Sequence, residues 1–349
     1  MAFASAARFA TTHKKLREGW HHRQVCMCSR SRGQKLIHDA ASLTDSSLAI
    51  GTWAWGNRLL YNYSPEQDKE LQKAFERAVQ NGITLFDTAD SYGTGKLNAR
   101  AELLLGKFMR YCPRQVRIAT KFASYPWRLT ARSIVNAAEQ SCERLGTKIY
   151  IAQMHWSPSR YLPLQERVLL QGLCEAQKAG YCEHIGVSNM GPTGLQRAQK
   201  LVEERGTRLK SVQVQMSLLC REALENGLLE TADAMGVSVI GYSPLCLGRL
   251  GGGAKRSGVR GALFDRLKND ELDRELKRVA MKKGASVGQV AVSWCVKKGV
   301  IVLAGCRNER QVLQNVGALR VELSEEESAR LEDAASKGRQ MVRNAFQTA

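Results

Sequence analysis

Short apolar stretches alternate regularly with longer amphipathic ones through most of the 349 residues of this chain, and this alternation narrows the folds open to it. Stretches with β-strand character lie at 47–56, 83–88, 116–122, 150–155, 184–188, 209–216, 237–242 and 300–303. Helical periodicity and capping signals predict helices at 65–80, 98–112, 130–145, 164–178, 192–204, 223–235, 270–283, 287–297, 308–319 and 324–335.

Eight strands, each followed by a helix, favour parallel pairing with right-handed connections. The pattern therefore predicts an α/β protein whose single folded domain, 45–345, is a closed (β/α)8 TIM barrel. The alternative is an open, doubly wound sheet. That topology calls for a glycine-rich phosphate loop after the first strand, and 51–56 contains no GxGxxG motif.

The composition is that of a globular protein, with 44% hydrophobic and 24% charged residues. No apolar run approaches the roughly 20 residues that cross a bilayer. The net charge of +19 raises nucleic-acid binding as an alternative function, for which binding to DNA would be salt-sensitive. The basic residues outside the first 38 are spread along the chain without an aromatic-interleaved cluster, so we expect neither nucleic acid nor membrane as a partner.

The first 38 residues contain eight Lys or Arg and one acid, and they are rich in Ala and Ser. This composition is typical of an organellar transit peptide that is disordered in the precursor, although a merely basic tail fits it too. A chloroplast (plastid stroma) and a mitochondrion are both compatible with the leader, because its composition does not separate them.

The ten cysteines are scattered, with no CxxC pair and no Cys/His set that has the spacing of metal ligands. Such scatter in a long chain indicates reduced thiols in an intracellular compartment. We therefore expect no metal ion.

Three successive predicted strands end in groups that can titrate. The stretch LFDTADSYG carries Asp87 and Tyr92 beyond the second strand, Lys121 ends the third strand, and His155 ends the fourth. Consecutive strands of a barrel are neighbours about 5 Å apart, so these four side chains should meet at the carboxyl rim.

A Lys121 ammonium beside the Tyr92 phenol would favour the tyrosinate and lower the phenol's pKa from its usual value of about 10. A phenol tuned in this way can give a proton to a carbonyl oxygen, with His155 orienting the carbonyl or relaying the proton. Each residue alone also has an ordinary structural explanation, and it is their joint placement that favours an active site.

The motifs DTADSYG, ATKF, MHW and VSN, in this order and spacing, resemble the aldo-keto reductase superfamily over about 45–345. The resemblance implies NADPH-dependent reduction of an aldehyde or ketone to an alcohol, with Tyr92 as the general acid and Asp87, Lys121 and His155 completing a catalytic tetrad. Within the superfamily, HWSPSRYLPLQE, GVSNMGP, VQVQMSLL and NAFQTA are most similar to plant plastid members of the pyridoxal reductase type. This similarity favours the chloroplast and suggests pyridoxal as a substrate.

The resemblance also implies where the nicotinamide end of NADPH would lie. Ser188, Asn189 and Gln213 match the family's carboxamide contacts, and Tyr242 matches the ring that stacks on nicotinamide. An aromatic face holds the planar ring, while amide and hydroxyl groups fix which side faces the substrate.

The phosphates would be held by the loop after residue 242 and by the segment GCRNERQVLQN. Arg307 is the implied 2′-phosphate partner, and Asn308 is expected to cap the helix that follows. Two positions depart from the family pattern, with Gln314 in place of a glutamate and Ala304 in place of a proline. The implied contacts are Ser243, Leu245 and Gly248 for the pyrophosphate, and Gly305, Arg307, Gln311 and Asn315 for the adenosine 2′-phosphate.

Three further expectations remain. Trp53, Trp55, Trp127 and Trp156 flank the predicted rim and are expected to form an aromatic wall around a planar aldehyde. A short-chain dehydrogenase is disfavoured, because its YxxxK motif needs a helix and the glycines between Tyr92 and Lys96 oppose one. The remaining alternative is an NADPH-binding regulatory subunit or redox sensor with little turnover, like the potassium-channel β subunits of the superfamily, although no obligate protein partner is evident.

Overall fold

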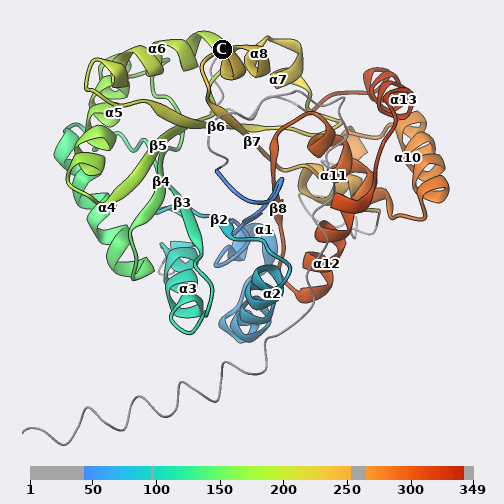
Figure 1. The fold of residues 1–349 in the computed structure, drawn as a ribbon, viewed down its shortest axis with the longest axis horizontal. Helices are drawn as coiled ribbons and strands as arrows, with labels where there is room; N and C mark the ends of the chain where they lie inside the picture. The colour runs from blue at the N-terminus through green and yellow to red at the C-terminus, as the bar shows by residue number, and fades with distance from the viewer. Residues whose placement is uncertain (1–42, 96–97, 253–264, 342–349) are drawn as a thin grey trace, which may run out of the picture. The chain divides into compact units, whose positions relative to one another are not determined.

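Eight parallel strands close into a barrel in sequence order, which confirms the predicted fold (Figure 1). The computed structural model describes residues 43–95, 98–252 and 265–341, so the predicted leader at 1–38 and the last four residues of the predicted domain lie outside the described part. The strands are β1 (Leu48–Gly51), β2 (Leu85–Asp87), β3 (Arg117–Phe122), β4 (Ile149–Met154), β5 (Cys182–Ser188), β6 (Leu209–Gln215), β7 (Ser238–Tyr242) and β8 (Ile301–Gly305).

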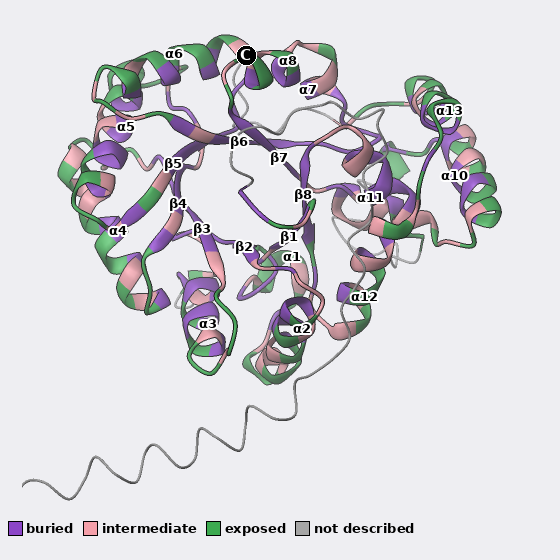
Figure 2. Cartoon of the chain, viewed as in Figure 1, coloured by how far each residue is buried: buried purple, intermediate pink, exposed green. Residues whose placement is uncertain are grey.

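Helices surround the barrel and turn their buried faces toward it, as the purple and green sides of each ribbon show (Figure 2). In Figure 1, α10 and α13 lie beside each other beyond α11. The helices are α1 (Arg58–Tyr61), η1 (Pro65–Gln67), α2 (Asp68–Gln80), α3 (Arg100–Met109), α4 (Ala131–Leu145), α5 (Pro163–Lys178), α6 (Pro192–Glu203), α7 (Glu222–Glu225), α8 (Leu228–Ala234), η3 (Cys246–Gly251), α10 (Asp270–Lys283), α11 (Val287–Lys297), α12 (Glu309–Gly317), η4 (Ala318–Arg320) and α13 (Glu325–Ser336).

Most predicted elements are correct to within a few residues, and the exceptions have local causes. The single helix predicted at 223–235 is wrong, because Gly227 adopts a left-handed φ of 80° and separates α7 from α8. The first strand is much shorter than the predicted 47–56, because a turn begins at Trp53. The short helices α1 and η3 were not predicted.

The inside of the barrel changes from apolar to polar along the strands. Side chains that point inward recur at every second residue. Leu85, Ala119 and Ile151 belong to the small apolar cluster within the barrel. The next inward position on each strand is polar, and these residues are Asp87, Lys121 and Gln153. This change of character places polar groups at the carboxyl rim, above an apolar floor.

An ion pair lies buried at this polar level. Lys121 Nζ donates to Asp87 Oδ1 and, at 2.7 Å, to the carbonyl oxygen of Thr88. The second carboxylate oxygen of Asp87 accepts from Gln153 Nε2 at 3.2 Å and from Gln213 Nε2 at 2.8 Å. Lys121 is 1% exposed and Asp87 is 2% exposed. Water therefore cannot solvate either charge if the other member of the pair is removed.

This arrangement predicts strong coupling between the two charges. Lys121→Met should lower the free energy of unfolding by about 3–5 kcal/mol, because it leaves Asp87 charged and buried without its cation. Adding Asp87→Asn should restore most of that loss, because the amide needs no counter-ion. Urea unfolding followed by circular dichroism measures both values. Lys337→Met, which removes an exposed lysine paired with Glu271, is the control and should cost at most about 1 kcal/mol. Additive losses in the double variant would contradict the coupling.

Candidate active site

A cavity of about 1210 Å³ opens at the carboxyl ends of the strands. Its walls come from the strand ends and the loops that follow them, as the barrel architecture predicts. The fifteen residues predicted to act in catalysis or to contact the cofactor all line this cavity: Asp87, Tyr92, Lys121, His155, Ser188, Asn189, Gln213, Tyr242, Ser243, Leu245, Gly248, Gly305, Arg307, Gln311 and Asn315.

The structure brings the four predicted tetrad residues together. Lys121 Nζ lies 5.0 Å from the centroid of the Tyr92 ring. The His155 ring meets the Tyr92 ring edge-on, with 5.7 Å between the centroids. Asp87 lies behind Lys121 and is ion-paired with it. A phenol, an ammonium and an imidazole therefore surround one end of the cavity.

The loop that carries Tyr92 is tied to the end of β3 by Asp90. The backbone N–H of Asp90 donates to the Lys121 carbonyl at 3.0 Å, and Asp90 Oδ1 accepts from the Ala123 N–H at 3.3 Å. Asp90 Oδ2 accepts from Arg128 Nη2 at 2.6 Å, and Arg128 Nη1 donates to the Ala123 carbonyl at 2.7 Å. These contacts set the position of Tyr92 relative to Lys121.

Sequence reasoning missed three of the supporting residues, Asp90, Arg128 and Gln153. Asp90 lies inside the DTADSYG motif, but its partner Arg128 is 38 positions away and only the fold joins them. Gln153 had a usable signal, because it lies two positions before His155 and therefore occupies the inward register of β4.

The expected fall in the pKa of Tyr92 is wrong. Burial and the nearby carboxylate of Asp87 raise the pKa of the Tyr92 phenol well above its usual value. Lys121 does not reverse this shift, since its ammonium donates to Asp87 and to the Thr88 carbonyl. Tyr92 is therefore protonated at neutral pH, which is the state that a proton donor requires.

His155 is neutral in this cavity. Burial, the Lys121 ammonium and the Arg128 guanidinium together lower the pKa of His155 well below its usual value. Its Nδ1 is buried and makes no hydrogen bond within the described part of the chain. A neutral imidazole between two cations can hold a polar ligand atom without adding a charge.

One wall of the cavity is organised by Asn189, which has a left-handed φ of 60°. Its amide nitrogen donates to the His155 carbonyl at 2.9 Å, and its amide oxygen accepts from the Tyr242 hydroxyl at 2.8 Å. Ser188 Oγ donates to the Gln213 carbonyl at 2.9 Å. Asn189 thus fixes the ring of Tyr242 in relation to His155, across β4, β5 and β7.

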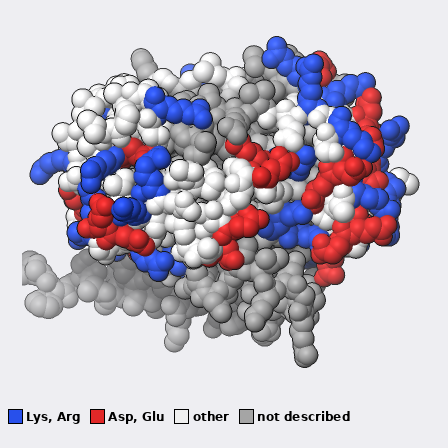
Figure 3. Space-filling view, turned by 90° about the horizontal axis from the view of Figure 1, so that it is seen from above, with Lys and Arg blue, Asp and Glu red and all other residues white. Residues whose placement is uncertain are grey.

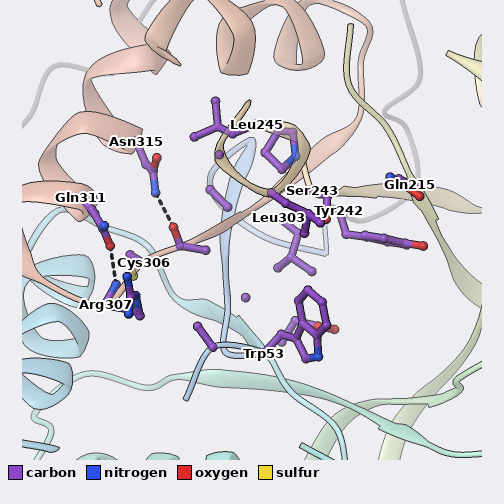
Figure 4. Close-up of a pocket in the computed structure, with 18 of the residues that line it drawn as sticks. Trp53, Gln215, Tyr242, Ser243, Leu245, Leu303, Cys306, Arg307, Gln311 and Asn315 are labelled. Atoms are coloured by element: carbon purple, nitrogen blue, oxygen red, sulfur yellow. Dashed lines mark hydrogen bonds between the residues drawn. The ribbon is translucent and has the colours of Figure 1, made fainter. Parts of the chain in front are cut away.

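The other end of the cavity is built around the start of α12 (Figure 4). The backbone N–H of Arg307 donates to Gln311 Oε1 at 2.8 Å, and Asn315 Nδ2 donates to the Gly305 carbonyl at 3.4 Å. Arg307 Nη1 donates to the Tyr61 carbonyl at 3.0 Å. This arrangement leaves the remaining guanidinium N–H groups of Arg307 for an anion.

Asn308 caps α12 as predicted, because its Oδ1 accepts from the Gln311 N–H at 2.9 Å. Gln314, where the family has a glutamate, accepts from Ser286 Oγ at 3.0 Å, so this position keeps an acceptor but loses the charge. Arg310 and Gln289 also line this end of the cavity and were not singled out from the sequence.

The loop after β7 follows an unusual backbone path. Ser243 and Leu247 have φ of 56°, and Gly248 has φ of 100°, all in the left-handed region. The loop is closed by its own backbone hydrogen bonds, because the Cys246 N–H donates to the Ser243 carbonyl at 2.9 Å and the Gly248 N–H donates to the Leu245 carbonyl at 2.9 Å. Leu245 and Tyr242 lie on the same wall (Figure 4).

The predicted aromatic wall is half right. Trp53 and Trp156 line the cavity. Trp55 is buried in the core, where its indole N–H donates to the Cys306 carbonyl at 2.8 Å, and Trp127 is 71% exposed outside the cavity. Trp55 misses the cavity because the chain turns at Trp53, after β1, and packs the Trp55 ring against Phe108 of α3.

Three further features concern residues 43–95, 98–252 and 265–341, the described part of the chain. The eight cysteines in this part are free, and no cluster of three or more His, Cys, Asp or Glu that could hold a metal ion is found there. None of the helices in this part combines the length and the apolar character of a membrane span. On the face seen in Figure 3, Lys and Arg are interspersed with Asp and Glu.

Comparison with known proteins agrees with this geometry. The model of the aldo/keto reductase family matches residues 47–336. The chloroplastic pyridoxal reductase of Arabidopsis thaliana is 43% identical over 320 residues, which cover 88% of each chain. A methylglyoxal reductase of Escherichia coli is 28% identical over 311 residues, which cover 88% of this chain and 97% of that one.

Solved structures agree on the fold. A thermostable aldo-keto reductase crystallised with the inhibitor epalrestat is 25% identical, with a TM-score of 0.67 over 83% of this chain and 95% of that one. An aldo-keto reductase of Klebsiella pneumoniae in complex with NADPH is 23% identical, with a TM-score of 0.66 over 87% of this chain and 94% of that one. The predicted family is confirmed, and the chain belongs to the aldo/keto reductase family of oxidoreductases.

Proposed function

We propose that this protein reduces an aldehyde or ketone to an alcohol with NADPH bound in the cavity, and that Tyr92 is the proton donor. One observation carries the proposal. The Tyr92 phenol, whose pKa is raised by burial, lies at one end of the cavity with the Lys121 ammonium 5.0 Å from its ring centroid and the His155 ring 5.7 Å from it. A protonated phenol beside an ammonium and an uncharged imidazole suits the transfer of one proton to a carbonyl oxygen.

The residues present fit NADPH. Asn189 and Gln213 offer amide groups near Tyr242, whose ring is held by its hydrogen bond to Asn189. Because the Gln213 amide nitrogen donates to Asp87, its oxygen is the atom left to accept from a carboxamide. At the other end, Arg307 and the N-terminus of α12 favour a phosphate. The left-handed loop after β7 lies between these two ends.

Each protein group has one task in the reaction. NADPH, when bound, supplies the hydride that the carbonyl carbon receives. Tyr92 gives its proton to the carbonyl oxygen, and the Lys121 ammonium lies 5.0 Å from the centroid of the Tyr92 ring. His155 orients the oxygen without adding charge, and Asn189 holds the His155 backbone through its carbonyl.

For the substrate we propose a planar aldehyde such as pyridoxal. The support is the 43% identity to a protein named pyridoxal reductase, together with the two indoles on the cavity wall, Trp53 and Trp156. The flat faces of these indoles suit an aromatic ring. Methylglyoxal is the small-aldehyde comparison, because a more distant relative carries that name.

Purified protein should oxidise NADPH when pyridoxal or an aromatic aldehyde is added, and the loss of NADPH absorbance measures the rate. Tyr92→Phe should lower kcat by at least about 10²-fold, because it removes the proton donor while leaving the ring. The dissociation constant for NADPH, from fluorescence titration, should stay within a factor of two. Loss of cofactor binding in the variant would remove Tyr92 from the proton-transfer role.

Arg307→Ala should weaken NADPH far more than NADH, by at least about tenfold in dissociation constant, because only NADPH has the 2′-phosphate that a guanidinium binds. Arg320→Ala, at an exposed arginine beyond α12, is the matched control. Equal weakening for both cofactors would show that Arg307 does not discriminate between them.

We also propose that residues 1–38 are a plastid transit peptide and that 45–345 is the catalytic domain. The leader's basic, acid-poor composition and the chloroplastic relative support the plastid. The full chain should be imported and shortened by isolated chloroplasts, whereas a chain beginning at residue 39 should stay outside. Import by mitochondria alone would overturn the assignment.

A further inference from the structure

A row of aromatic side chains leads from the cavity wall to the surface of the protein. Trp156 lines the cavity, and the Tyr125 ring meets it edge-on with centroids 6.5 Å apart. Tyr125 in turn stacks on Trp127, with centroids 4.5 Å apart and an interplanar angle of 12°. Trp127 is 71% exposed. We call Tyr125, Trp127 and Trp156 the aromatic platform.

The platform is held in place by hydrogen bonds within two loops, those after β3 and β4, and from the start of α5. Gln165 Nε2, at the start of α5, donates to the Tyr125 carbonyl at 2.6 Å and to the Arg128 carbonyl at 3.2 Å. The indole N–H of Trp156 donates to the Tyr161 hydroxyl at 2.7 Å. The Arg128 guanidinium lies 5.2 Å from the Tyr125 ring centroid. A surface held this rigidly loses little entropy when a ligand binds.

Large apolar side chains near the platform are exposed to water, although a globular protein usually buries such side chains. Leu129 is 61% exposed, Tyr161 is 53% exposed and Leu164 is 83% exposed on the same two loops and the start of α5. A large exposed apolar patch beside a cavity commonly marks a binding surface. The exposed face of Trp127 is the part of the platform that remains open to a further ring.

The platform is continuous with the cavity. Ser91 and Trp156 both line the cavity, and both contact Tyr125, the first through its hydroxyl and the second through its ring. The platform's charged neighbour, Arg128, is already paired with Asp90 in a contact of 2.6 Å. A ligand group on the platform is therefore expected to be flat and uncharged.

We propose that the aromatic platform is an outer subsite, which binds a neutral aromatic ring that a substrate carries at a distance from its carbonyl group. This inference rests on the proposed carbonyl reduction. It extends the substrate class from single-ring aldehydes to aldehydes with a second, distal ring. The carbonyl lies at Tyr92 and the distal ring stacks on Trp127, so that one extended substrate spans the cavity mouth.

The test compares two substrates that differ only in the distal ring, dodecanal and 12-phenyldodecanal. A long chain is needed, because the ring centroids on the path from Tyr92 to Trp127 are 5.7, 5.1, 6.5 and 4.5 Å apart in turn. Trp127→Ala should lower kcat/KM for 12-phenyldodecanal about five- to tenfold, since stacking on an aromatic side chain is commonly lost at this scale on alanine substitution. The loss should appear in KM, and kcat/KM for dodecanal should stay unchanged. Trp127→Phe should keep most of the activity toward the phenyl substrate.

Tyr111→Ala is the matched control, because Tyr111 is an 83% exposed aromatic on the connection between α3 and β3, at the opposite end of the barrel. It should change neither substrate. An equal loss for both substrates in Trp127→Ala, or no loss for either, would overturn the outer subsite and leave the proposed reduction standing.

Two further outcomes would also overturn the outer subsite. In the first, Trp127→Ala dissociates an oligomer in sedimentation, so that a second copy covers the platform. In the second, Trp127→Ala abolishes binding to phosphatidylcholine vesicles. If the unaltered protein reduces neither aldehyde nor pyridoxal, the proposed function fails, and the outer subsite fails with it.

Discussion

A buried ion pair between Lys121 and Asp87 joins the strands at the polar end of the barrel. A charged group inside a barrel is tolerated only when other groups replace its water. Asp87, on β2, accepts from Lys121 on β3, from Gln153 on β4 and from Gln213 on β6. One carboxylate therefore links four strands at the polar end of the barrel, and Asp87 itself lines the cavity that opens there.

This pair also explains the protonation states around it. Burial and the carboxylate of Asp87 raise the pKa of the Tyr92 phenol. Burial, together with the Lys121 ammonium and the Arg128 guanidinium, lowers the pKa of His155. At neutral pH the site thus holds a protonated phenol and a neutral imidazole beside a compensated pair of charges.

The fold and the meeting of the site residues were predictable, because both follow from periodicity along single strands. Asp87 and Lys121 lie in the inward register of their strands, and the barrel brings adjacent strand ends together. The direction of the Tyr92 pKa shift was not predicted, since it depends on how deeply the fold buries the phenol and how close it lies to the Asp87 carboxylate. The places of Trp55 and Trp127 were missed for a related reason, because they depend on loop paths that no periodicity encodes.

The residues around the buried ion pair lie on strands, whereas the aromatic residues proposed to select the substrate lie on loops. Asp87, Lys121 and Gln213 lie on strands, where ladder hydrogen bonds and core packing fix each side chain. Tyr125 and Trp156 lie on loops after β3 and β4, and side-chain hydrogen bonds hold the backbone around them. A change in these loops alters which carbonyl compound reaches Tyr92 without disturbing the ion pair beneath it. Substrate range in this protein is therefore expected to vary independently of the proton donor.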